Sequence, residues 1–117
     1  MTAAQEVPKP KGPKAGAGGT FTATTVEAND VHTFRWKLTF HNLTGKAGAA
    51  HVHMGVRGKP GAVVIPLCGP CRSGQTGTTK ISSKVEDAME QGKAYVNVHT
   101  AKNAAGEIRG QIRLVSS

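Results

Sequence analysis

Apolar and polar residues alternate with a period of two along most of the chain, a pattern typical of strands that pack one face and expose the other. The clearest example is residues 32–43, where large apolar side chains share one face. These side chains are Phe34, Trp36, Leu38 and Phe40. Residues 20–26 show the same alternation, with threonines on the polar face. Because residues 27–30 (Glu-Ala-Asn-Asp) supply turn chemistry between the two segments, a hairpin is predicted.

Shorter segments with strand character follow along the rest of the chain. They are residues 49–54, 62–67, 78–82, 94–99 and 107–115. In the last of these, Ile108, Ile112 and Leu114 are expected to face inward. Glu107, Arg109, Gln111 and Arg113 are then expected to face outward. Three of them, Glu107, Arg109 and Arg113, can form an exposed cross-strand charge network of little energetic weight.

One short helix is predicted over about residues 84–91. Ser83 and Glu86 have the spacing of a capping box, and Gly92 is a natural C-terminal stop. With the strands, this predicts an all-β fold. We expect an antiparallel, Greek-key-like β-sandwich or barrel of about seven to eight short strands with one short helix.

The length of 117 residues fits a single domain, which divides into three parts. Residues 1–8 are expected to add an N-terminal strand, and residues 9–19 form a loop or arm rich in Lys, Pro and Gly. Residues 20–117 are expected to form the β domain itself.

The net charge of +8 raises the question of an anionic partner. Specific nucleic-acid binding is not expected, because Phe34, Trp36 and Phe40 are assigned to the core and no phosphate-binding loop is present. An extracellular protein or an anionic polysaccharide remains a candidate partner. No serine lies in a nucleophile elbow and no carboxylates are paired, so no enzymatic activity is predicted. The oligomeric state is left open.

The location is expected to be secreted or periplasmic. No apolar run approaches the 18 residues of a membrane span, so no transmembrane segment is predicted. The chain carries no signal peptide, which we take to have been removed.

Three histidines can meet on one surface of the predicted sheet. His51 and His53 flank Val52, so both imidazoles point to the same face, and His99 lies on the polar face of residues 94–99. If these strands are neighbours, the three side chains suit zinc or copper with an open fourth position. The candidates for a fourth ligand or a supporting contact are Glu107, Asn97, Tyr95 and Met54. The competing interpretation is a set of surface histidines without function.

The only two cysteines, Cys68 and Cys71, form the sequence CGPC, which is identical to the thioredoxin redox motif. The glycine-containing segment after Cys71 does not continue as a helix, so the setting that activates such a thiol is absent. A loop disulfide is therefore the preferred interpretation, and an oxidising compartment is suggested. A reduced, copper-binding thiol pair stays open as an alternative.

Four blocks of sequence follow one another along the chain: AQEVP at residues 4–8, LTGKAGAAHVHMG at 43–55, GAVVIPL at 61–67 and GKAYVNVHTAKNAAGEIRGQ at 92–111. In this order they resemble the CHRD family, the domain named after chordin. The resemblance implies a secreted or cell-surface β-sandwich module, makes a metal site at the three histidines more credible, and brings no catalytic reaction. The CGPC loop departs from the family pattern.

Together these observations predict a binding module that holds one transition-metal ion through His51, His53 and His99. Copper is favoured over zinc because of the expected secreted context, the oxygen-free ligand set and the nearby Met54. The alternatives are a metal-free protein- or matrix-interaction module, or a copper-dependent redox enzyme. The redox-enzyme alternative rests on a weaker similarity to Cu/Zn superoxide dismutase, and this similarity concerns the fold and not the function.

Overall fold

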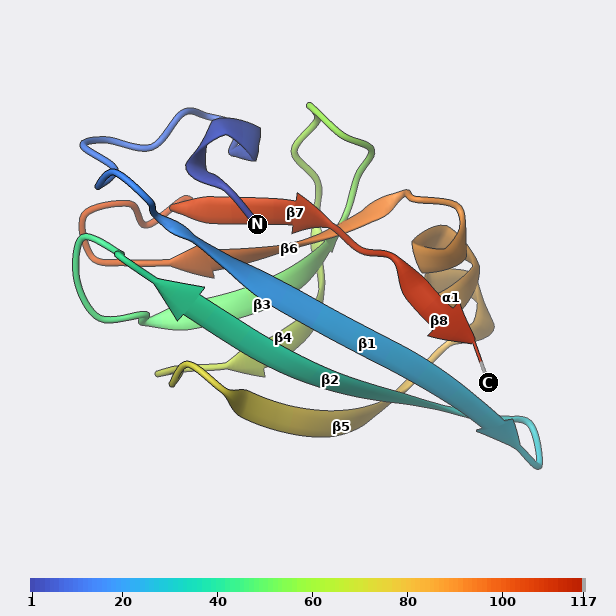
Figure 1. Ribbon diagram of the computed structural model, residues 1–117. Coiled ribbons are helices and arrows are strands. Elements are labelled where there is room, and N and C mark those ends of the chain that lie inside the picture. The colour runs from blue at the N-terminus through green and yellow to red at the C-terminus, as the bar shows by residue number, and fades with distance from the viewer. Residues whose placement is uncertain (117) are drawn as a thin grey trace.

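The two longest alternating segments form the predicted hairpin. In the computed structural model, which describes residues 1–116, β1 (Gly18–Ala28) pairs antiparallel with β2 (Val31–His41) (Figure 1). The register of the two strands places Ala23 opposite Trp36. The turn between them contains Asn29 and Asp30 at φ values of 53° and 63°. Short polar side chains tolerate this left-handed conformation better than most others, so the sequence at the turn matches its backbone.

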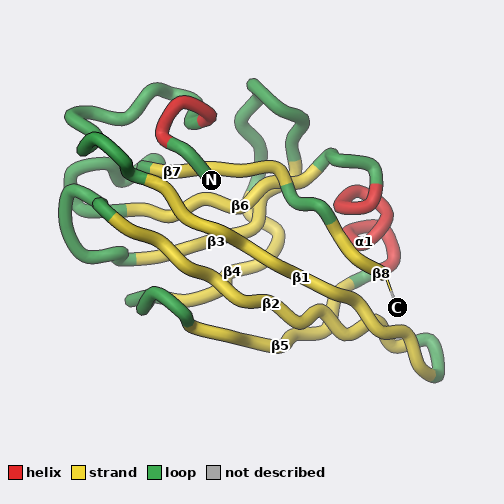
Figure 2. Tube along the Cα trace, in the orientation of Figure 1, coloured by secondary structure: helices red, strands yellow, loops and turns green. Residues whose placement is uncertain are grey.

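The strands form two four-stranded sheets packed as a sandwich (Figure 2). The first sheet has the order β5-β2-β1-β8, and the second has the order β4-β3-β6-β7. The remaining strand bounds are β3 (Ala49–Met54), β4 (Val63–Cys68), β5 (Gln75–Ile81), β6 (Ala94–His99), β7 (Ile108–Gln111) and β8 (Leu114–Ser116). The chain crosses between the sheets after β2, β4, β5 and β7, and the crossing after β5 runs through the helix α1 (Ser83–Glu90). The predicted all-β sandwich with one short helix is therefore confirmed.

The core lies between the two sheets and follows the predicted alternation. Phe34 and Leu38 of β2 are fully buried, and Trp36 lies over Gly77 of the neighbouring strand β5. The second sheet contributes Val52, Val96, Val98 and Ile108. Burying each such side chain contributes roughly 1.5–3 kcal/mol, so this layer is the main source of stability.

The helix α1 (Ser83–Glu90) lies within one residue of its predicted bounds, but its cap differs. The cap is Ser82, whose side chain accepts a hydrogen bond from the backbone N–H of Val85. Glu86 does not close a capping box, because its carboxylate accepts a hydrogen bond from Thr25 and pairs with His32. Ser82 and Ser83 are both possible N-caps of the helix. Because the contacts of Glu86 with Thr25 and His32 leave it unable to close a capping box with Ser83, they favour Ser82.

The expected strand over residues 107–115 is two strands in different sheets. β7 ends at Gln111, and the chain then leaves the second sheet to pair with β1 in parallel through Leu114. Between them, the backbone N–H of Ile112 donates to the carbonyl of Ala94, and the Ile112 side chain enters the core. The alternation continues through the crossing, which is why the sequence looks like one strand.

The N-terminal residues also differ from the continuous strand expected over residues 1–8. Only Thr2 pairs as a strand does, through isolated bridges to Gly18 and Arg109, and a 3-10 helix, η1 (Ala3–Gln5), follows. The turn of η1 brings the side chain of Glu6 into the interior, where it is buried. The segment therefore covers the outer face of the second sheet at β7. No helix among the described residues has the length and apolar character of a membrane span.

Candidate metal centre

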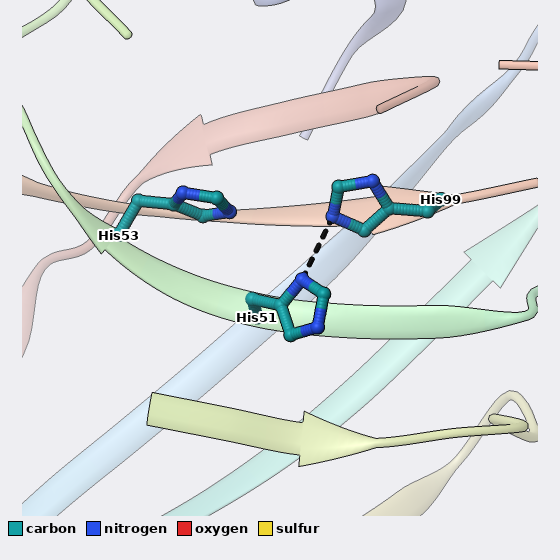
Figure 3. Close-up of side chains that lie close together, drawn as sticks. All are labelled: His51, His53 and His99. Atoms are coloured by element: carbon teal, nitrogen blue, oxygen red, sulfur yellow. Dashed lines mark hydrogen bonds between the residues drawn. The ribbon is translucent and has the colours of Figure 1, made fainter. Parts of the chain in front are cut away.

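The pairing of β3 with β6 brings the three histidines together. The two strands are antiparallel neighbours, with His51 opposite Asn97, His53 opposite Tyr95 and Ala49 opposite His99. One nitrogen from each of His51, His53 and His99 lies within 4.8 Å of the corresponding nitrogens of the other two. Figure 3 shows the three rings converging over the outer face of the second sheet. The structure therefore contains the cluster that the sequence predicted.

The closest contact in the cluster joins His51 to His99. Nδ1 of His51 and Nε2 of His99 lie 3.0 Å apart and share a hydrogen bond, and the ring centroids are 4.7 Å apart. A hydrogen bond between two imidazole nitrogens requires one proton between them. A metal ion bound by both nitrogens would take the place of that proton.

Backbone carbonyls fix the orientation of two of the three rings. Nδ1 of His53 donates to the carbonyl of Gly61 at 2.9 Å, and Nδ1 of His99 donates to the carbonyl of Ala104 at 2.8 Å. Each bond holds the Nδ1–H tautomer and leaves Nε2 as the nitrogen that can bind an ion. Metal-ligating histidines commonly donate their second N–H in this way, so the surroundings suit ligation.

Tyr95 and Asn97 support His53, and no distance places them as ligands. The Tyr95 ring stacks on His53 with centroids 4.7 Å apart and planes 3° apart, and its hydroxyl accepts a hydrogen bond from the N–H of Gly61. Oδ1 of Asn97 lies 2.9 Å from Nε2 of His53. A neutral His53 that donates from Nδ1 has no proton on Nε2, so this oxygen faces an unprotonated nitrogen and would have to move for an ion to bind there.

The electrostatic environment favours the neutral forms of His51 and His99. Burial lowers the pKa of His51 and of His99 below the ordinary value, and the neighbouring histidines lower both further. Neutral imidazole is the form that binds metal, so little proton competition is expected near pH 7.

A hollow of about 440 Å³ opens beside His51 and His99. Its lining includes the small side chains of Ala49, Ala101 and Ala104 and one cation, Lys46. A metal ion on the histidines would therefore be reachable from solvent on this side.

The structure does not bring Glu107 or Met54 to the histidines. Glu107 is fully buried, and its carboxylate accepts hydrogen bonds from the backbone N–H and hydroxyl of Thr44, from the hydroxyl of Thr100 and from the amide of Asn103. Burial alone would raise its pKa, but these donors outweigh it and hold the pKa below the ordinary value. Met54 packs against the core cluster between the sheets.

The expectation that Glu107 and Arg109 are exposed is wrong. Arg109 is 1% exposed and lies with its guanidinium carbon 3.5 Å above the centre of the Tyr95 ring. Its Nη2 donates to the carbonyl of Val56 and to the side chain of Gln111. The polar face of this sheet is covered by the loop around Val56 and by the N-terminal segment, so its polar residues form a second, buried layer.

Glu6 is a buried acid beside the centre that the sequence reasoning missed. Burial raises the pKa of Glu6 to about 7. The charge of Arg109 and the hydrogen bond from Asn97 both lower this pKa, but their effect is smaller than that of burial. The AQEVP block contains Glu6, yet nothing in the local pattern shows that a residue so near the chain start would reach the second sheet.

Replacing Glu6 by glutamine should change how stability depends on pH in the metal-free protein. An acid whose pKa is raised on folding stabilises the folded state below its unfolded pKa, and that contribution is lost as pH rises through the folded pKa. The stability of Glu6→Gln relative to the original protein should therefore increase by about 1–3 kcal/mol between roughly pH 4.5 and 7. Urea unfolding at several pH values measures this difference. A difference that does not vary with pH would contradict the assignment.

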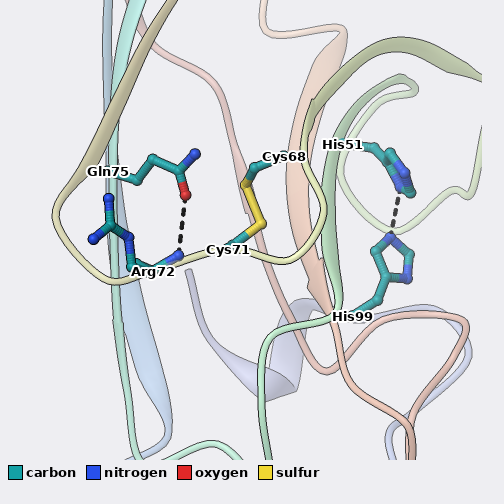
Figure 4. The surroundings of a disulfide bond; sticks show 6 residues. All are labelled: His51, Cys68, Cys71, Arg72, Gln75 and His99. Atoms are coloured by element: carbon teal, nitrogen blue, oxygen red, sulfur yellow. Dashed lines mark hydrogen bonds between the residues drawn. A yellow bond between two sulfur atoms is a disulfide. The ribbon is translucent and has the colours of Figure 1, made fainter.

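Cys68 and Cys71 form the predicted disulfide (Figure 4). The bond links the end of β4 to the loop that leads to β5, and the N–H of Cys71 donates to the carbonyl of Ala47. Since both sulfurs are bonded to each other, neither is a thiolate ligand in this structure.

The comparisons agree with the fold and with the four sequence blocks. The family model of the CHRD domain matches residues 1–112 of the 117-residue chain. No curated protein and no solved structure matches the chain significantly. The match covers β1 to β7 and all three histidines of the cluster. The chain therefore belongs to the CHRD domain family.

Proposed function

We propose that this domain is a secreted or periplasmic binding module that holds one transition-metal ion through His51, His53 and His99. Membership of the CHRD family indicates a binding module, and CHRD domains are generally extracellular or secreted. The observation that carries the proposal is the arrangement of the three imidazoles. One nitrogen of each lies within 4.8 Å of the others, and backbone carbonyls hold two of the rings in the tautomer that leaves Nε2 available.

Copper is the proposed ion, with zinc as the second choice. The cluster offers three imidazole nitrogens, and no carboxylate or thiolate of the described residues joins it. Copper(II) binds nitrogen sites more tightly than the other divalent first-row ions. The disulfide between Cys68 and Cys71 fits an oxidising compartment, where copper(II) persists. Met54 no longer contributes to this argument, because it packs against the core.

The test is a calorimetric titration of metal-stripped protein with Cu(II), Zn(II) and, under reducing and anaerobic conditions, Cu(I). One ion should bind per chain, with Cu(II) tighter than Zn(II). The His51→Ala/His99→Ala double variant should bind at least about a hundredfold more weakly, a loss of about 2.7 kcal/mol or more. His41→Ala is the matched control, because His41 is exposed and lies outside the cluster, and its affinity should not change.

Two results would overturn the proposal. The first is binding that survives in the double variant, which would place the ion elsewhere. The second is no binding tighter than about millimolar, a free energy of only about 4 kcal/mol. In that case the histidines serve the packing of β3 on β6, and the domain is a metal-free interaction module.

A further inference from the structure

Threonines and cations dominate the middle of the outer face of the first sheet, and Val26, Ala28 and Val31 occupy its end at the turn between β1 and β2. Along β1, β2 and β5, the exposed or half-exposed outward positions include Thr20, Thr22, Thr24, Arg35, Lys37, Thr39, Thr76, Thr78 and Lys80. No Asp or Glu occupies an outward position of these three strands. This face lies on the opposite side of the sandwich from the histidine cluster, which is on the outer face of the second sheet.

The strand register arranges these side chains in two rows that run across the sheet. Thr24, Arg35 and Thr78 are paired neighbours in one row, and Thr22, Lys37 and Thr76 are paired neighbours in the next. Adjacent strands lie about 4.8 Å apart, and outward residues along one strand lie roughly 6.5–7 Å apart. Each row therefore places one cation between two hydroxyl groups, and the two cations follow each other along β2.

The cations of these rows are not neutralised within the domain. Among the described residues, no carboxylate forms an ion pair with Arg35, Lys37 or Lys80. A groove of about 600 Å³ runs over the two rows, and Arg113, from the segment that joins β7 to β8, adds a third cation to its lining. The face is thus a hollowed surface of one sign of charge with hydroxyl groups beside each charge.

We propose that this face, formed by Thr22, Thr24, Arg35, Lys37, Thr76 and Thr78, binds a linear acidic polysaccharide whose sugars carry carboxylates. Repeated cations match repeated carboxylates, and the guanidinium of Arg35 suits bidentate contact with a carboxylate. Threonine hydroxyls both donate and accept hydrogen bonds, as sugar hydroxyls do. The net charge of +8 adds long-range attraction.

A nucleic acid fits the same surface less well. Single strands are bound on aromatic platforms, whereas Phe21 and Trp36, the two aromatic residues in the lining of the groove, lie at inward positions and stack on each other. Charge alone would attract both polymers, so the test has to separate local contacts from overall charge.

The experiment measures binding of an oligogalacturonate by calorimetry at low salt, with dextran as the uncharged probe. The Arg35→Gln/Lys37→Gln double variant should bind at least about tenfold more weakly. The matched control is Lys84→Gln/Lys93→Gln, which removes the same charge from exposed positions on α1 and just after it. This control should lose no more than about twofold.

A second pair of variants tests the hydroxyl groups without changing the charge. Thr22→Val/Thr78→Val keeps the shape of both side chains and should weaken binding by several-fold, while Cu(II) binding stays unchanged in all these variants. Equal losses in the two charge variants would overturn the proposal, because attraction would then depend on net charge alone. Equal binding of dextran, no binding of the oligogalacturonate, or tighter binding of duplex DNA through Arg35 and Lys37 would also overturn it. Because the two faces use different residues, failure here leaves the metal proposal intact.

Discussion

Replacing Glu107 by alanine should cost the domain about 3–5 kcal/mol of unfolding free energy, because several buried hydrogen-bond donors lose their one shared acceptor. The carboxylate is the common acceptor for donors from two separate places in the chain, Thr44 and the loop that holds Thr100 and Asn103. Alanine leaves those donors buried without an acceptor, and each unsatisfied group costs roughly 1–3 kcal/mol. Urea unfolding monitored by circular dichroism measures the loss.

Two further variants make the Glu107 result specific. Glu27→Ala, at an exposed position in β1, should change stability by less than about 0.5 kcal/mol. Glu107→Gln should show an intermediate loss, because its amide nitrogen cannot accept the hydrogen bond from the N–H of Thr44. A Glu107→Ala protein within about 1 kcal/mol of the original would mean that the network contributes little.

Removing residues 1–7 should lower the melting temperature by roughly 10 °C or more, which corresponds to at least about 2 kcal/mol for a domain of this size. The deletion removes both backbone hydrogen bonds between Thr2 and Arg109, which measure 2.9 and 3.0 Å. It also removes Glu6 and uncovers the guanidinium of Arg109 and the amide of Asn97. Thermal unfolding followed by circular dichroism gives the value.

The control for this deletion is replacement of the exposed residues 13–15 by serines, which leaves the covering segment in place and should shift the melting temperature by only a degree or two. If the truncated protein has the same melting temperature as the original, the N-terminal segment is a tail that does not stabilise the second sheet.

Alternation along the chain was sufficient to predict the strands and the direction of most side chains. The bounds predicted for β3 and β6 are those observed, and Phe34, Trp36 and Leu38 occupy the core as expected. A period of two tells which residues share a face, but it does not tell whether that face meets water. The burial of Arg109 depends on segments that are far away in sequence, so the strand pattern could not reveal it.

The histidine cluster was partly predictable for the same reason. The spacing of His51 and His53 puts both on one face of a strand whatever its neighbours are. The approach of His99 needs the pairing of Ala49 with His99, a contact across fifty residues of chain. The carbonyls of Gly61 and Ala104 that orient the rings are backbone atoms, and no side-chain motif marks them.

The covered polar face has a consequence for how β6 can vary. Five of its six residues are buried, whereas β2 alternates between buried and exposed positions through residues 34–38. In a scan of all single substitutions, β2 should tolerate change at every second position. β6 should tolerate it almost nowhere, with apolar replacements rejected at Asn97 as firmly as polar ones at Val96 and Val98. Although β6 belongs to an antiparallel sheet with only one face against the core, its mutational profile would then be that of a strand buried on both faces.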